Sequence, residues 1–193
     1  MVNTKISFWL IPSEEDKAFF KRIIDNLAQE YDAPSFTPHV TIYSGEYTPD
    51  DNPTELIEQS IKDMKSFSLK VEKLGYTEEF TKTLFVQFSP SATLSQISET
   101  IRTRLSKPSQ YILNPHLSLI YRQLNETIKK NLTNSLSLNK SEVFFNEVRA
   151  ISTPALIKSK EDVENWQTIC TIKLQNYSKR QKAEGRGQKG KDW

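Results

Sequence analysis

Two short stretches of this sequence hold its only two histidines, and the stretches are similar to each other. Pro-His-Val-Thr at 38–41 and Pro-His-Leu-Ser at 115–118 both place a proline before the histidine and a hydroxyl residue two positions after it. Each motif lies in a short apolar run that is typical of a β-strand, on which residues i and i+2 share a face. We therefore expect each histidine to share a face with its hydroxyl residue.

Two histidines with nearby hydroxyl groups suit the cleavage of a phosphodiester. In-line attack needs a base for the attacking oxygen and an acid for the leaving oxygen, and histidine can do either because its pKa is about 6.5. Base and acid act on opposite sides of phosphorus, so we predict that His39 and His116 share one cleft, without assigning their roles. We predict that Thr41 and Ser118 donate hydrogen bonds to the phosphate. This chemistry needs no metal and no cofactor.

Chance alone explains the double motif poorly. A single His-x-Thr or His-x-Ser pattern is weak evidence, because roughly one histidine in eight matches it by chance. A match at both histidines is expected about once in sixty cases. The shared proline and apolar flanks make chance less probable still, and they favour a catalytic role over a structural one.

The elements around the motifs also repeat. Strand-like runs at 6–11 and 83–88 are each followed by an amphipathic helix pattern and then by a histidine strand. A second helix and a third strand complete each unit, so we predict units at about 5–76 and 83–152 and a final strand at 166–174. Two such units favour one two-lobed domain over 1–176, with both histidine strands at one cleft.

Composition indicates an ordinary soluble protein. The chain has 193 residues, of which 36% are hydrophobic and 26% are charged. No apolar stretch is long enough to cross a bilayer, and no signal peptide precedes the first strand, so we expect a cytoplasmic monomer that does not bind membranes. The single cysteine, Cys170, lies in an alternating run and is interpreted as a buried strand thiol. The histidines and the cysteine show no metal-ligand spacing.

The C-terminal stretch differs from the rest of the chain. Residues 178–193 contain six basic and two acidic side chains, a net charge of +4, whereas the whole chain carries +2. We predict that 177–193 is a disordered basic tail. A solvated end without function is favoured over a weak contact with RNA.

The paired motifs resemble a known superfamily. His-Val-Thr at 39–41 and His-Leu-Ser at 116–118 are similar to the signature of the two-histidine phosphoesterases, and Phe-Trp-Leu-Ile-Pro at 8–12 is similar to the opening of their cyclic phosphodiesterase branch. The resemblance covers about 4–174. It implies a bilobal α+β fold in which antiparallel sheets surround a central cleft. It also implies metal-independent opening of nucleoside 2′,3′-cyclic phosphates to 2′-phosphates and of ADP-ribose 1″,2″-cyclic phosphate to the 1″-phosphate.

Two tyrosines follow the motifs as candidate substrate contacts. The resemblance implies such a contact for Tyr121, at the spacing His-x-Ser-x-x-Tyr. On an ideal strand Tyr121 would face away from the histidine unless the strand ends or bulges, whereas Tyr43 would share the face of His39. Trp9 and Trp166 could stack on a base, although core packing is favoured for both.

Two alternatives stay open at this point. Another branch of the superfamily acts on RNA ends, as a 2′,3′-cyclic phosphodiesterase or a 2′-5′ RNA ligase, and this alternative predicts a basic cleft. A module that binds nucleotides or RNA without turnover predicts salt-sensitive binding that needs the tail.

Overall fold

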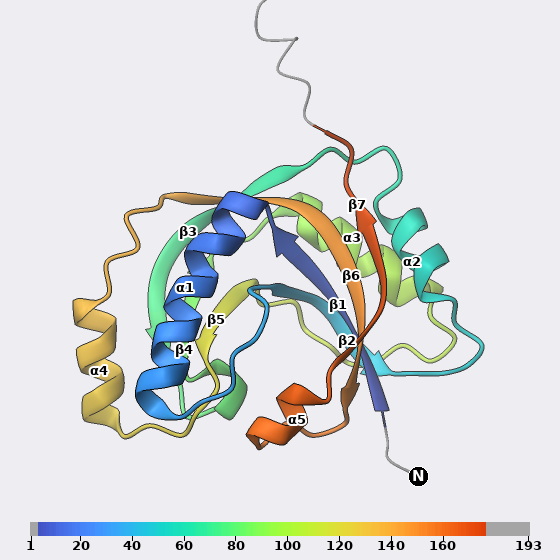
Figure 1. Ribbon diagram of the computed structural model, residues 1–193. Helices are drawn as coiled ribbons and strands as arrows, with labels where there is room; N and C mark the ends of the chain where they lie inside the picture. The colour runs from blue at the N-terminus through green and yellow to red at the C-terminus, as the bar shows by residue number, and fades with distance from the viewer. Residues whose placement is uncertain (1–3, 177–193) are drawn as a thin grey trace, which may run out of the picture.

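The structure of the protein is a computed structural model that describes residues 4–176 (Figure 1). Within this range the elements are, in chain order, β1 (Thr4–Pro12), α1 (Glu14–Tyr31), β2 (Val40–Glu46), α2 (Pro53–Ser60), β3 (Phe67–Tyr76), the 3-10 helix η1 (Phe80–Lys82), β4 (Leu84–Phe88), α3 (Ala92–Arg104), β5 (His116–Ile120), α4 (Glu126–Ser135), β6 (Glu142–Pro154), α5 (Lys160–Glu164) and β7 (Gln167–Lys173). The tail predicted at 177–193 lies outside the described residues.

The predicted order of elements is confirmed. Strand-helix-strand-helix-strand occurs twice, as β1 to β3 and as β4 to β6, and β7 is the final strand. Two details differ from the prediction. The second helix ends at Ser60 instead of continuing to Met64, and the backbone at Asp63 is left-handed, with φ 61°. The short helix α5, which begins with a capping box at Ser159, has no counterpart in the predicted repeat.

The strands pair antiparallel in a ring that reflects the repeat. β1 pairs with β2 as β4 pairs with β5, and β1 pairs with β6 as β4 pairs with β3. The pairings β2–β5 and β3–β6 join the two units. Exchanging the units therefore maps the ring onto itself, so the chain has a pseudo-twofold arrangement. β7 pairs only with β6 in this sheet and breaks the symmetry.

The helices cover the outside of the strands. In Figure 1, α4 lies at the left and α2 at the right of the strands, whereas α1 overlaps β3 and β4 in this view and α3 overlaps β6 and β7. α1 packs mainly across β5 and α3 across β2, so each unit's first helix covers the histidine strand of the other unit. None of the helices within 4–176 is long and apolar enough to span a membrane.

The start of α1 is held by a carboxylate. Ser13 is the N-cap of α1, but its side chain makes no capping hydrogen bond, contrary to the usual role of serine there. Asp16, in the first turn, instead accepts from the Phe144 amide at 2.8 Å and from Lys140 at 2.6 Å. These bonds dock the helix against the beginning of β6.

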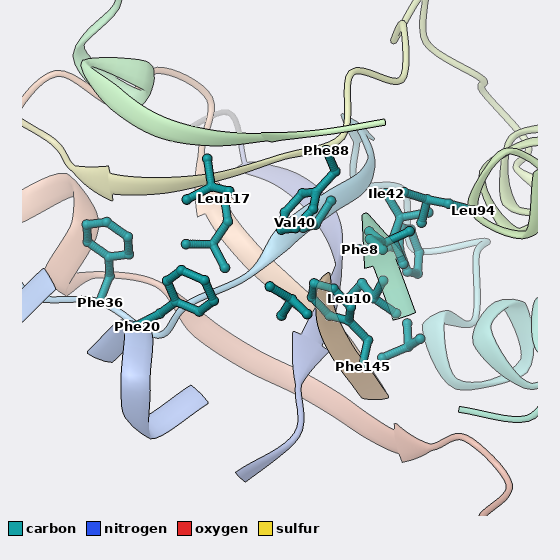
Figure 2. Packing of buried hydrophobic residues seen from close by; sticks show 14 of the residues in the cluster. Phe8, Leu10, Phe20, Phe36, Val40, Ile42, Phe88, Leu94, Leu117 and Phe145 are labelled. Atoms are coloured by element: carbon teal, nitrogen blue, oxygen red, sulfur yellow. The ribbon is translucent and has the colours of Figure 1, made fainter. Parts of the chain in front are cut away.

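The main core lies between the sheet and the helices. Figure 2 shows Phe8 and Leu10 of β1 beside Ile42 and Phe145, with Phe20 of α1 close to Leu117. On β1 the pleat sends Ile6, Phe8 and Leu10 into this core, while Ser7 and Trp9 line the cleft described below. Burial of each such apolar side chain contributes about 1.5–3 kcal/mol. The core thereby fixes which side chains remain for the site.

Candidate active site

A cleft of about 210 Å³ lies on the strand face opposite the core, and all four residues predicted for catalysis line it: His39, Thr41, His116 and Ser118. β2 and β5 are joined at one register pair, Val40 with Leu117, which are the middle residues of the two motifs. In antiparallel register this places each histidine across from the hydroxyl residue of the other motif. The two units therefore meet at the predicted residues.

Both histidines are held in the same way. His39 Nδ1 lies 2.7 Å from the carbonyl oxygen of Thr37, and His116 Nδ1 lies 2.7 Å from that of Asn114. A carbonyl oxygen only accepts, so Nδ1 carries the hydrogen in both rings. Nε2 is then left to take or give a proton, which is the atom that acid–base catalysis needs.

His39 is enclosed by aromatic rings. Its ring stacks on Trp9 with centroids 3.6 Å apart and an interplanar angle of 9°, and Phe36 and Trp166 stand edge-on to it. Only 6% of His39 is exposed. Burial disfavours the charged imidazole and lowers the pKa of His39 to about 4, although the hydrogen bond to Thr37 acts in the opposite direction.

His116 has a more open and more polar environment. It is partly exposed, and Phe85 stands edge-on to it at a centroid distance of 5.6 Å. Burial is also the main cause that lowers the pKa of His116, and the positive charge of Lys82 adds to it. The hydrogen bond to Asn114 and the negative charge of Glu79 oppose this shift.

Matching β-bulges follow the two motifs and decide where the two tyrosines lie. On β1, Phe8 pairs with Tyr43 and Trp9 pairs with Thr41, so Ile42 is an extra residue in β2. In β5 the extra residue is Leu119, 77 positions later. A bulge reverses the alternation of side chains along the strand. The residue after the extra one therefore points into the core, and the residue after that points into the cleft.

Because of the bulges, one tyrosine lies in the core and the other lies at the cleft. Tyr43 is 0% exposed in the main core, and its hydroxyl accepts a hydrogen bond from the Ser109 amide. This burial argues against the predicted substrate contact. Tyr121 lines the cleft, as does Ser44, which is the residue at the corresponding position of the first motif. The motifs are 77 residues apart, and this offset, counted back from Tyr121, leads to Ser44 instead of Tyr43 as the equivalent residue of the first motif.

The two predicted phosphate donors differ in the hydrogen bonds that they already make. The Ser118 hydroxyl donates to the Thr81 carbonyl at 2.7 Å. Burial raises the pKa of the neighbouring Tyr121, and the proximity of Ser118 opposes this shift. The Thr41 hydroxyl has no hydrogen-bond partner among the described residues, and it is partly exposed. The Thr41 hydroxyl is thus ready to donate to a phosphate, whereas the Ser118 hydroxyl first has to release the Thr81 carbonyl.

The loops before the histidines cross to the opposite motif. Phe36, in the first loop, stacks on Tyr121 with centroids 4.0 Å apart. Tyr111, in the second loop, donates from its hydroxyl to the Thr41 carbonyl at 3.1 Å, and burial raises the pKa of Tyr111 to about 12. The sequence gives no sign of Phe36 or Tyr111 at the site, because no local pattern indicates a contact between distant loops and strands.

Trp9 and Trp166 pack against each other and also reach the cleft. Trp9 is 5% exposed and packs with Ile11, Ile151 and Trp166 in a small apolar cluster separate from the main core. Both tryptophans also line the cleft.

Cys170 is a free, partly buried thiol in β7. The described part of the chain contains no cluster of three or more His, Cys, Asp or Glu side chains that could hold a metal ion.

Comparison with known proteins gives a consistent result. A family model described as cyclic phosphodiesterase-like protein matches residues 4–174. A cyclic phosphodiesterase from Arabidopsis thaliana is 25% identical over 173 residues, which cover 87% of this chain and 94% of that protein.

Solved structures share the fold. The E. coli LigT structure in complex with 3′-AMP has a TM-score of 0.55 and 12% identity, over 90% of this chain and 99% of LigT. The structure of TT0787 from Thermus thermophilus has a TM-score of 0.57 and 11% identity, over 89% and 98% of the two chains.

Proposed function

The chain belongs to the cyclic phosphodiesterase-like family of two-histidine phosphoesterases, and from this membership we propose that it hydrolyses small cyclic phosphate diesters without a metal ion. The proposed substrates are nucleoside 2′,3′-cyclic phosphates, opened to 2′-phosphates, and ADP-ribose 1″,2″-cyclic phosphate, opened to the 1″-phosphate. One observation supports the proposal most strongly. The two histidines line a single cleft, and in each of them the backbone hydrogen bond uses Nδ1 and leaves Nε2 available.

The two environments favour opposite roles for the two histidines. The lowered pKa of His39, about 4, keeps its ring neutral near pH 7, so Nε2 of His39 takes the proton of the attacking water. The water oxygen forms the new bond to phosphorus, and the bond to the leaving sugar oxygen breaks. His116 acts in its protonated form, which the negative charge of Glu79 favours, and its Nε2 gives a proton to that oxygen.

The hydroxyl groups hold the phosphate during this step. Thr41 donates to a non-bridging oxygen directly, and Ser118 does so when it releases the Thr81 carbonyl. Fixed donors of this kind stabilise the charge that builds up in the transition state. Tyr121 and the edge of Trp166 bound the space beside the phosphate, where the nucleoside is placed.

The charge of the cleft favours small substrates over RNA ends. The alternative activity on RNA predicts a basic cleft, but among the described residues the lining contains one lysine, Lys82, and one glutamate, Glu79. These charges offset each other. A module that binds without turnover differs from the enzyme in one measurable respect, because it leaves the cyclic phosphate intact.

The test is phosphorus NMR of adenosine 2′,3′-cyclic phosphate and ADP-ribose 1″,2″-cyclic phosphate, each incubated with the protein in EDTA. We expect ring opening to a single regioisomer. His39→Ala and His116→Ala should each reduce turnover by about a hundredfold or more, because each removes a proton-transfer group. Cys170→Ser, a change outside the cleft, serves as the matched control and should keep wild-type activity.

The outcomes separate the hypotheses. Near wild-type turnover in either histidine variant would exclude the two-histidine mechanism. Turnover that EDTA abolishes would exclude metal independence. Cleavage of oligonucleotide 2′,3′-cyclic phosphates alone would select the activity on RNA ends, and binding without ring opening of any of these compounds would select the binding module.

A further inference from the structure

Lys82 lies at the edge of the cleft, next to the His116 half of the site. It is the last residue of η1 and lines the cleft together with Thr81 and Ser118. Its ammonium nitrogen lies 4.5 Å from the centroid of the Phe85 ring, a cation–π contact that restrains the side chain. Phe85 itself stands edge-on to His116.

The Phe85 ring lies against a glycine on the neighbouring strand. Gly75 pairs with Phe85 across β3 and β4, and a Cβ atom at Gly75 would lie only 2.7 Å from the ring atom Cζ. The absence of a side chain at Gly75 lets the ring lie on the strand. Lys82 is therefore positioned through a chain of packed contacts that restricts its motion.

The charge of Lys82 is not neutralised by an ion pair. Among residues 4–176 no carboxylate oxygen lies within 4.0 Å of its ammonium group. Arg149, whose charge acts on His39, is by contrast paired with Glu147. An unpaired ammonium group at a cleft is available to an anion that enters it.

The His116 half also needs such a group. The Ser118 hydroxyl already donates to the Thr81 carbonyl, whereas Thr41 on the opposite side has its hydroxyl free. Burial disfavours the charged form of both imidazoles, so neither histidine is a fixed positive charge. Of the side chains described along the cleft, Lys82 thus supplies the one fixed positive charge.

We propose that Lys82 binds the reacting phosphate on the His116 side of the cleft. This inference rests on the proposed function and adds a residue to it. Ring opening converts a diester with one negative charge into a monoester with up to two, since water adds a P–O bond and the sugar oxygen leaves with a proton. The ammonium group of Lys82 stabilises this added charge through a charge-assisted hydrogen bond to the phosphate.

The experiment compares Lys82→Met and Lys82→Arg with wild type. Met keeps most of the length of lysine without the charge, and Arg keeps the charge. We expect Lys82→Met to lower kcat/KM for adenosine 2′,3′-cyclic phosphate about 10- to 100-fold and to weaken inorganic phosphate binding about tenfold or more, measured by calorimetry. Lys82→Arg should recover most of both. Lys130→Met, an exposed change on α4, is the matched control and should match wild type.

Binding and turnover test different statements. Equal phosphate affinity in wild type and Lys82→Met, including no binding by either, would overturn the role of Lys82. A kcat/KM within threefold of wild type in Lys82→Met would do the same. If phosphate binding depends on Lys82 but no cyclic phosphate is turned over, the inference stands and the proposed hydrolysis fails.

Discussion

The two halves of the cleft start from the same motif and differ in what surrounds the histidine. In both, a carbonyl two residues earlier holds Nδ1, and a bulge follows three residues after the histidine. Trp9 and Phe85 occupy equivalent register positions, opposite Thr41 and Ser118. Trp9 lies flat on His39, but Phe85 meets His116 with its edge.

This difference separates the proton affinities of two otherwise similar imidazoles. The flat stack and the rings of Phe36 and Trp166 bury His39, whereas His116 stays partly exposed beside Lys82 and Glu79. A pair of titratable groups in different environments is the usual basis of an acid–base pair. Comparing the halves therefore teaches more about mechanism than either half alone.

The largest expected contrast concerns the leaving group. A sulfur analogue of adenosine 2′,3′-cyclic phosphate, with a thiolate as the 3′ leaving group, needs no general acid. His116→Ala should lose about a hundredfold or more on the oxygen substrate and much less on the sulfur analogue, whereas His39→Ala should lose as much on both. Steady-state rates of both variants on both substrates are the measurement. The opposite pattern would exchange the two roles.

The second contrast concerns stability and pH. His39 has a pKa of about 4 in the folded protein and about 6.5 when unfolded, so its neutral form stabilises the fold fully above pH 6.5. That contribution is lost as pH falls from 6.5 to 4 and amounts to about 3 kcal/mol.

Urea unfolding at pH 7 and pH 4 tests this, with His39→Gln as the comparison. Other groups titrate in both proteins and cancel. The wild-type protein should lose about 3 kcal/mol more than the variant between these pH values. An equal loss in both proteins would show that His39 is not held neutral by burial.

The third contrast concerns the hydroxyl groups. Thr41→Val should lower kcat/KM about a hundredfold, because the free Thr41 hydroxyl is a ready phosphate donor. Ser118→Ala should lower it about tenfold and also reduce the free energy of unfolding by about 1 kcal/mol, because the Thr81 carbonyl loses its partner. Kinetics and urea unfolding measure the two effects. Equal kinetic losses would mean that Ser118 exchanges partners at no cost.

The smallest contrast concerns two glycines. Gly75→Ala should cost about 1–2 kcal/mol and displace the Phe85 ring, since the new Cβ would lie 2.7 Å from it. Gly45→Ala, in the other half, places its Cβ 3.1 Å from Tyr43 and should cost less than about 1 kcal/mol. The NMR signal of His116 should move in the first variant only. A larger shift in Gly45→Ala would refute the chain of contacts from Gly75 to His116.

Much of the fold could be predicted from local patterns. The apolar run at 6–11 is typical of a strand that is buried on both faces, and the helical spacing from Phe19 to Tyr31 specifies a helix because burial of one helix face follows a period that the sequence displays. The element order then follows from the repeat. The proximity of His39 and His116 was also predictable, because two equivalent units place equivalent strands together.

The sequence by itself determined the elements, their repetition and the four residues at the centre of the cleft, since these depend on near neighbours in the chain. Tertiary structure decided which tyrosine faces the cleft, because the bulges at Ile42 and Leu119 arise from pairing with distant strands. It also decided that His39 is buried and His116 is partly exposed. Burial depends on side chains far apart in the sequence, so no local pattern contains it.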